Sequence, residues 1–286
     1  MKGIVLAGGT GSRLWPITRS VSKQLLPVYD KPMIYYPIST LMLAGIREIL
    51  IITTPHDQSQ FKELLGDGSE IGVSFIYEIQ PEPKGLAQAF TIGEEFLAGD
   101  SCLMILGDNI FHGAGLGRDI IRELPTSGAH IFTYEVSNPS DYGILEVSND
   151  EKPLSITEKP TEFISNLAVT GVYFFDGKVS DVAKNVKPSK RGEMEITSVI
   201  DHYLKSRTLT FTRLSRGSTW LDTGNPDSLN DAASYVKIIE DRTGLKIACL
   251  EEISFNQGWM TQEQINSRIE QYKMNSYATY LQRLIS

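Results

Sequence analysis

The chain has 286 residues, of which 41% are hydrophobic and 22% are charged, a composition typical of a globular protein that can bury a sizeable core. Its formal net charge of −8 argues against a surface that coats nucleic acid, which is normally basic. No apolar run approaches the roughly 20 residues of a membrane span, and the opening MKGIVLAGG is too short an apolar stretch for a signal peptide. Because two distant cysteines, Cys102 and Cys249, do not make a disulfide framework, we expect a cytoplasmic protein with neither nucleic-acid nor membrane partners.

In the first half of the chain, short apolar runs alternate with helical patterns. Strands are predicted at residues 2–7, 47–54, 72–79 and 101–108, and helices at 35–46, 56–66 and 85–97. Buried strands separated by helices of this length indicate βαβ units and a parallel sheet covered on both faces. The predicted fold class is α/β, with a mostly parallel, Rossmann-like central sheet.

The second half changes character, because its strands have few helical residues between them. They are predicted at 129–136, 142–148, 154–160 and 168–176, and they suggest antiparallel additions to the sheet. A helix at 195–206 and a strand at 209–215 follow. A long helix is predicted at 225–244, with Pro226 in its first turn and Gly244 past its end. From residue 253 to the end, polar and apolar residues mix at helical spacing.

A glycine-rich segment, LAGGTGSRLWPIT at residues 6–18, follows the first predicted strand. Glycine lets a backbone N–H approach an anion closely at the mouth of an α/β sheet. The dinucleotide pattern G-x-G-x-x-G fails because Leu14 stands at its third glycine, which argues against an NAD-binding oxidoreductase. The P-loop pattern fails too, since Arg13 and Leu14 do not fit it. The segment is interpreted as a phosphate loop of another kind, with an ordinary tight turn as the alternative.

Charged residues elsewhere strengthen the phosphate interpretation. Arg13 would offer a forked donor to phosphate oxygens and Lys23 a point charge, and together they suit a triphosphate. Asp108 ends a buried strand in MILGDNIF, where an unpaired charge is costly, and Mg²⁺ is a plausible partner. Asp222 in STWLDTGNP is a second candidate ligand; alternatively, it bonds its own backbone in a turn.

Together these segments resemble the sugar-phosphate nucleotidylyltransferase family over nearly the whole chain. The matching motifs are GIVLAGGTGSRLWPIT, SKQLLPVYDKPMIYYPISTLMLAGIREILIITTP, LLGDGS, QPEPKGLAQAF, LGDNIF, YGILE, EKP, VTGVYFF, RGEMEIT and WLDTG. Within the family, the likeness is to members that transfer a thymidylyl group from dTTP to α-D-glucose 1-phosphate. It implies dTDP-glucose and pyrophosphate as products, Mg²⁺ as cofactor, and a place in dTDP-rhamnose, lipopolysaccharide or O-antigen biosynthesis.

The resemblance also implies roles for individual positions. Nucleotide contacts are expected from Leu6, Gly8, Gly9, Thr10, Gly11, Ser12, Arg13, Lys23, Gln24, Gln80, Gly85 and Asp108. Sugar contacts are expected from Asn109, Gly143, Glu158, Lys159, Val169 and Tyr173. The expected metal ligands are Asp108 and Asp222, and catalysis is assigned to Arg13, Lys23, Asp108, Lys159 and Asp222.

The chain is interpreted as a catalytic domain at residues 1–240 followed by a mostly helical C-terminal appendage at 241–286. The nucleotide half is placed at about 1–110 and the sugar half at about 111–240. By resemblance, a homotetramer is expected, with a regulatory nucleotide-sugar site near subunit contacts that involve the appendage.

Two alternatives stay open from the sequence. One is a nucleotidylyltransferase that uses UTP, CTP or another sugar phosphate. The other is a non-catalytic regulatory subunit of the same fold, which would be expected to lose the phosphate-binding cations or the metal ligands. Since Arg13, Lys23, Asp108, Lys159 and Asp222 are all present, we favour the enzyme.

Overall fold

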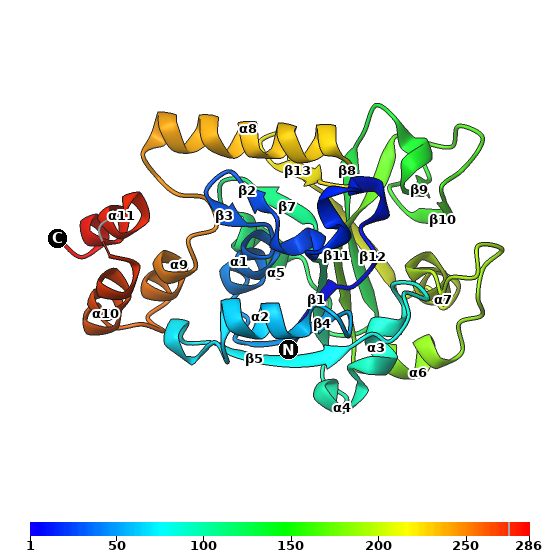
Figure 1. Ribbon diagram of the computed structural model, residues 1–286. Helices are drawn as coiled ribbons and strands as arrows, with labels where there is room; N and C mark the ends of the chain where they lie inside the picture. Colours follow the sequence, from blue (N-terminus) through cyan, green and yellow to red (C-terminus); the bar gives the residue numbers. More distant parts are fainter. Residues whose placement is uncertain (274) are drawn as a thin grey trace.

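A nine-stranded sheet crosses the molecule in the computed structural model, which describes residues 1–273 and 275–286 (Figure 1). Seven strands follow the order β10-β9-β11-β6-β1-β4-β5, and off this path β8 pairs with both β11 and β12. The strands are β1 (Lys2–Ala7), β4 (Glu48–Thr53), β5 (Ser74–Ile79), β6 (Cys102–Leu106), β8 (Ala129–Glu135), β9 (Gly143–Val147), β10 (Pro153–Glu158), β11 (Leu167–Phe175) and β12 (Leu209–Arg213).

The first half of the chain builds a parallel sheet in the order β5-β4-β1-β6. In the second half, β11 pairs antiparallel with β6, β8 and β9, whereas β12 lies parallel to β8. The predicted α/β class, with its parallel centre and antiparallel additions, is confirmed. From β1 the chain adds β4 and β5 on one side of the sheet and then β6 on the other side. Open α/β sheets bind their ligands in the crevice that this change of side leaves at the carboxyl ends of the strands, here between β1 and β6.

Helices cover both faces of the sheet because successive side chains of a strand point to opposite sides. Val5 and Ile51 belong to one buried cluster, with α1 (Tyr35–Leu43), α2 (Gln58–Leu65) and α5 (Leu116–Arg122). Ile4 and Leu50, their neighbours along β1 and β4, belong to the other cluster. That cluster includes α3 (Gln88–Ile92), α4 (Glu94–Leu97), α6 (Val179–Lys184) and α7 (Ile196–Lys205).

The single helix predicted at 85–97 is two short helices instead, α3 and α4, separated at Gly93. A Cβ on Gly93 would lie 2.8 Å from Cδ2 of Leu50, so this position brings the backbone close to the sheet. The helical spacing of the sequence does not reveal that close approach.

Two small ribbons and a long helix lie outside the nine-stranded sheet. The ribbons pair β2 (Pro27–Val28) with β3 (Lys31–Pro32), and β7 (Asn109–His112) with β13 (Thr219–Asp222). The long helix, α8 (Pro226–Thr243), packs Ala232 and Val236 against Val28 and Ile110 of these ribbons. Its predicted ends are confirmed, with Pro226 in the first turn and Gly244 beyond the last at φ 69°.

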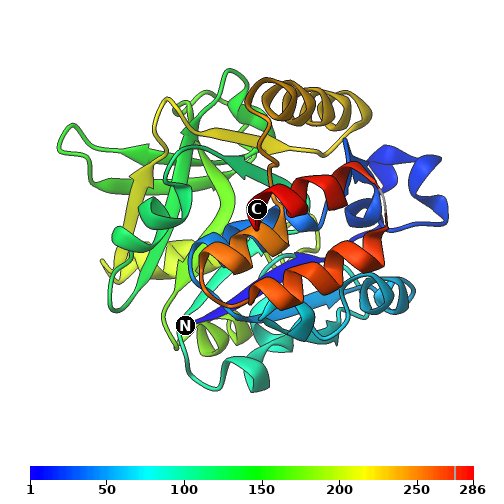
Figure 2. The same cartoon turned by 90° about the vertical axis from the view of Figure 1, so that its left-hand side faces the viewer.

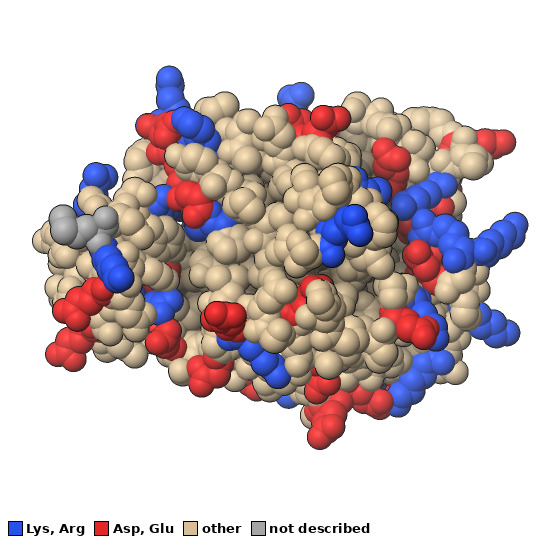
Figure 3. All heavy atoms as spheres, viewed as in Figure 1, with Lys and Arg blue, Asp and Glu red and all other residues tan. Residues whose placement is uncertain are grey.

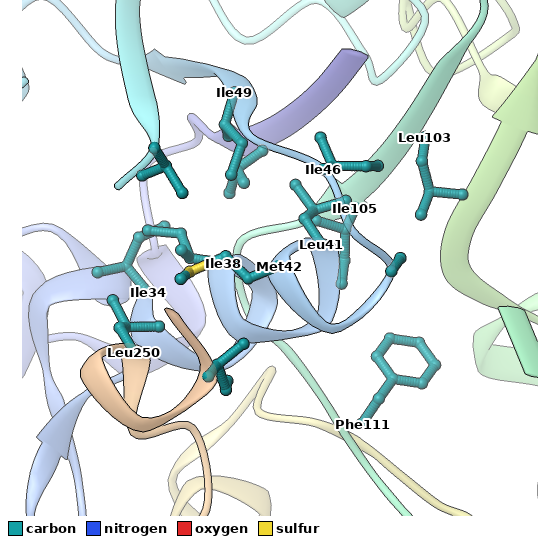
Figure 4. Close-up of a cluster of buried hydrophobic side chains, with 14 of the residues drawn as sticks. Ile34, Ile38, Leu41, Met42, Ile46, Ile49, Leu103, Ile105, Phe111 and Leu250 are labelled. Atoms are coloured by element: carbon teal, nitrogen blue, oxygen red, sulfur yellow. The ribbon is translucent and has the colours of Figure 1, made fainter. Parts of the chain in front are cut away.

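The C-terminal tail packs on the main core as α9 (Leu250–Asn256), α10 (Gln262–Tyr272) and α11 (Ser276–Leu284) (Figure 2). Figure 4 shows Leu250 of α9 beside Ile34, the residue that precedes α1. Residue 274, inside the predicted appendage, lies outside the described residues. In the part of the chain that is described, none of the helices has the length and apolar character needed to cross a membrane.

Candidate active site

One pocket of about 490 Å³ lies at the crevice between β1 and β6. Every residue predicted for the site lines it, although these residues lie far apart in the sequence. From the nucleotide set these are Leu6, Gly8, Gly9, Thr10, Gly11, Ser12, Arg13, Lys23, Gln24, Gln80, Gly85 and Asp108. From the sugar and metal sets they are Asn109, Gly143, Glu158, Lys159, Val169, Tyr173 and Asp222. Their individual roles stay predictions, but their convergence is a property of the fold.

The glycine-rich loop leaves the carboxyl end of β1 in conformations that glycine favours. Gly9 and Gly11 have φ values of 97° and 59°, in the region where a Cβ is strained. A Cβ on Gly8 would clash with Oε1 of Gln80. Thr18 donates to the carbonyl of Gly11 at 2.7 Å, which fixes the far side of the loop. The loop can therefore present backbone N–H groups to an anion without side chains in the way.

The ribbon of β7 and β13 brings the two candidate metal ligands together. Its antiparallel register sets Asp222 opposite Asn109, and Asp108 immediately precedes Asn109. Two carboxylates 114 positions apart in the sequence therefore lie at the same end of one ribbon. The alternative interpretation of Asp222, a turn residue bonded only to its own backbone, does not account for this pairing.

Asp108 is held by two neighbours. Lys23, only 8% exposed, places its Nζ 2.5 Å from Oδ2 of Asp108. Asn109 donates from Nδ2 to Oδ1 of Asp108 at 2.9 Å, and Trp220 donates from its indole nitrogen to Oδ1 of Asn109 at 2.6 Å. This chain of bonds fixes which way the Asn109 amide faces.

The two carboxylates differ in acidity because their neighbours differ. Burial alone would raise the pKa of Asp108, but the Lys23 ammonium and the hydrogen bonds from Lys23 and Asn109 lower it overall. At Asp222, burial and then the negative charge of Asp108 raise the pKa to about 6. The two acidic groups are thus close enough to repel each other.

This donor set fits Mg²⁺. The ion is hard, prefers carboxylate oxygens, and binds through one or two carboxylates together with substrate phosphates. A cation between Asp108 and Asp222 would relieve the repulsion that raises the pKa of Asp222. Among the described residues, no group of three or more His, Cys, Asp or Glu is placed to hold a metal. An ion bound by Asp108 and Asp222 would keep water molecules, or take substrate phosphate oxygens, at its remaining positions.

The pocket is also lined by groups suited to a sugar phosphate. Glu158 ends β10 and Lys159 follows it, with the N–H of Lys159 bonded to the carbonyl of Tyr142 at 2.9 Å. Burial, followed by the charge of Glu195, raises the pKa of Glu158. Lys and Arg side chains also gather over α7 and β10 at the right-hand end of Figure 3.

The structure adds residues that the sequence interpretation did not assign. They are Asp141, Tyr142, Gly171, Arg191, Glu193, Glu195, Thr197, Trp220 and Gly224, with several apolar neighbours. Arg191 pairs with Glu195 at 3.0 Å and lies 3.8 Å from Glu158. The segment RGEMEIT, dense in charge before a predicted helix, was the available signal.

Gly85 offers a prediction about the loop that faces the glycine-rich segment. Its φ is 113°, and a Cβ there would clash with the backbone carbonyl of Met194. We expect Gly85→Ala to cost more than about 1 kcal/mol of unfolding free energy, measured by thermal and denaturant unfolding. Gly45→Ala is the matched control, because Gly45 also has a positive φ, 79°, with nothing within 4 Å of its Cβ position. Equal losses in the two variants would contradict the clash.

Comparison with known proteins agrees with this geometry. The nucleotidyl transferase family model matches residues 2–237. A glucose-1-phosphate thymidylyltransferase of Neisseria meningitidis is 51% identical over 286 residues, covering 100% of this chain and 99% of the relative. A Mycobacterium tuberculosis protein of the same name is 51% identical over 285 residues, with the same coverage.

Solved structures show the same fold. A Bacillus anthracis protein assigned as a glucose-1-phosphate thymidylyltransferase, crystallised with sucrose, is 42% identical, with a TM-score of 0.76. The match covers 82% of this chain and 94% of that one. A UDP-glucose pyrophosphorylase structure superimposes with a TM-score of 0.74 at 24% identity, which supports the likeness of fold alone. The family match and the full-length relatives together establish that the chain belongs to the nucleotidyl transferase family.

Proposed function

We propose that this protein transfers a thymidylyl group from dTTP to α-D-glucose 1-phosphate, giving dTDP-glucose and pyrophosphate. The observation that carries the proposal is one pocket that is lined by the glycine-rich loop, by Asp108 and Asp222, and by Glu158 and Lys159. Relatives named for this activity match the whole chain at about half identity. We favour dTTP over UTP or CTP because those relatives are named as thymidylyltransferases.

The chemistry explains why the pocket needs cations more than a base. A sugar phosphate is largely dianionic at neutral pH, since its second pKa is about 6. Its oxygen can attack the α-phosphorus of dTTP directly, while the bond from that phosphorus to the bridging oxygen breaks and pyrophosphate leaves. The barrier lies in bringing two polyanions together in line, so positioning and charge neutralisation dominate.

The residues of the pocket divide these tasks. We propose that the glycine-rich loop and Arg13 bind the departing phosphates, and that Lys159 binds the sugar phosphate. Lys23 would bind nucleotide phosphate when it leaves its ion pair with Asp108. Mg²⁺, when held by Asp108 and Asp222, would neutralise charge on the phosphoryl oxygens. Gln80 would contact the base, and its amide already bonds the carbonyl of Gly85 at 3.2 Å.

We also propose the wider setting that the family likeness implies. The protein would work as a homotetramer in the cytoplasm, with a regulatory nucleotide-sugar site near its subunit contacts, and would supply dTDP-glucose for deoxysugar synthesis. The free, buried thiols of Cys102 and Cys249 are compatible with a reducing compartment.

Glu158 is expected to bind sugar hydroxyls, since the proposed reaction gives it no proton to transfer. Glu158→Gln should weaken glucose 1-phosphate binding by roughly 1.5–3 kcal/mol, about 10- to 150-fold in Kd, and leave dTTP binding nearly unchanged. Calorimetry on each ligand separately measures this. Glu146→Gln, an exposed site on neighbouring β9, is the matched control. Equal losses of affinity for glucose 1-phosphate and dTTP in Glu158→Gln would show that Glu158 does not bind the sugar specifically.

One assay tests the function itself. Pyrophosphate release is followed across dTTP, UTP, CTP and GTP, each with several sugar 1-phosphates. We expect the highest kcat/KM for dTTP with glucose 1-phosphate. A higher value for another pair would replace the proposed substrates, and no release with any pair would favour the non-catalytic alternative.

A further inference from the structure

Thr223 stands just beyond the end of the β7–β13 ribbon and contacts the backbone of Asp108. Its N–H lies 3.2 Å from the carbonyl oxygen of Asp108, and its Oγ1 lies 2.8 Å from the same oxygen. The side chain is completely buried, at 0% exposure. The paired register of the ribbon ends at Asp222 and Asn109, so Thr223 extends the pairing by one residue.

The hydroxyl of Thr223 has one proton to donate and two neighbouring acceptors. Besides the carbonyl of Asp108, the Sδ atom of Met33 lies 3.2 Å away. A thioether is a weak acceptor, so the proton belongs to the carbonyl. One backbone oxygen of Asp108 thus accepts from both the N–H and the hydroxyl of Thr223.

These two hydrogen bonds restrain the end of the ribbon. A two-stranded ribbon is only marginally stable by itself, and its last residues are the least constrained. Asp108 and Asp222 both lie at that end, and their carboxylates repel each other. The hydroxyl of Thr223 anchors the backbone of one carboxylate to the residue that follows the other.

We propose that Thr223 is a positioning residue that holds Asp108 and Asp222 together for a shared divalent cation. It acts through the backbone of Asp108 and contacts neither substrate nor cation. The inference rests on the proposed function, because it assumes that the two carboxylates bind one ion. A purely structural role for the hydroxyl would affect the stability of the fold and leave cation binding unchanged.

The test measures cation binding directly, without turnover. Mn²⁺ alone is titrated into the full-length protein, and free Mn²⁺ is followed by electron paramagnetic resonance. The variants are Thr223→Val, which keeps the volume and removes the hydroxyl, and the pair Thr223→Ser and Thr223→Ala, which differ by the hydroxyl alone. Thr40→Val is the matched control, since Thr40 is equally buried and donates to the carbonyl of Tyr36 at 3.1 Å within α1.

Outer-shell partners of metal ligands are typically worth about 10- to 100-fold in affinity. We expect Thr223→Val and Thr223→Ala to raise the Kd for Mn²⁺ about tenfold, while Thr223→Ser and Thr40→Val stay within about twofold of the unaltered protein. Melting temperatures are recorded on the same preparations. If Thr223→Val fails to fold, the Ser and Ala variants still isolate the hydroxyl.

Two failures are distinguishable. Saturable Mn²⁺ binding that is equal in the unaltered protein and in the Val and Ala variants would overturn the role of Thr223 alone. No saturable Mn²⁺ binding by the unaltered protein would overturn the shared cation site, and with it this inference. The proposed substrates are tested independently by the pyrophosphate-release assay.

Discussion

Replacing Arg13 by alanine is expected to lower kcat by roughly 10²–10³, the size of the loss when one preorganised charge-stabilising donor is removed. Arg13 lines the pocket beside Gly224, and its Nη1 would lie 3.2 Å from a Cβ at that position, where the oxygens of Asp222 would lie 3.3 Å away. The guanidinium is therefore close to Asp222, one of the two proposed metal ligands. If its charge acts chiefly on the departing pyrophosphate, kcat falls far more than KM rises.

Steady-state kinetics for dTTP and glucose 1-phosphate check this expectation. Arg19→Ala is the matched control, because Arg19 is also exposed and lies on the next turn of the same segment, outside this pocket. It should change kcat by less than about threefold. If Arg13→Ala changed KM alone, Arg13 would bind the phosphates equally strongly in the ground state and in the transition state.

Asp222→Asn should raise the Mg²⁺ concentration needed for half-maximal rate by at least about tenfold. The carboxylate loses its charge, whereas Asp108 and the phosphates of the substrate still bind the ion. Activity should therefore recover partly in excess Mg²⁺. Asp108→Asn should behave alike, although it also removes the partner of Lys23. The double variant should be little worse than the poorer single variant, since ligands of one metal act as a unit.

The turn interpretation of Asp222 predicts a different outcome. If the carboxylate only stabilises the turn that follows β13, Asp222→Asn lowers the melting temperature and leaves the Mg²⁺ dependence unchanged. Both quantities should be measured on one preparation, with the exposed Asp231→Asn as the control. An unshifted Mg²⁺ curve would remove Asp222 from the site.

Local sequence was sufficient to predict the parallel half of the fold. The apolar runs predicted as strands at 2–7, 47–54, 72–79 and 101–108 contain β1, β4, β5 and β6, because buried parallel strands are apolar on both faces. The break at Gly93 was missed, since it depends on contact with Leu50 of a different strand. The pairing of β12 parallel to β8 was equally hidden, because strand direction is decided by the path of the intervening chain.

The site shows the same division. The glycine pattern and the placement of Asp108 after a buried strand pointed to phosphate and metal chemistry from the residues themselves. The residues alone left Asp222 as a candidate ligand with a turn residue as the alternative, and family likeness decided between them, since nothing local says that β13 pairs with β7. No role was predicted for Thr223 or Trp220, because each acts through hydrogen bonds to a residue more than 100 positions away.

Stereochemistry at the α-phosphorus tests the central claim most directly, that the sugar phosphate attacks dTTP without an enzyme-bound intermediate. One diastereomer of dTTP with sulfur at the α-phosphorus is converted with glucose 1-phosphate, and the configuration of the nucleotide-sugar product is determined by ³¹P resonance. A single in-line displacement predicts inversion. Retention would require two displacements, and so a covalent nucleotidyl-enzyme intermediate, and would contradict the account.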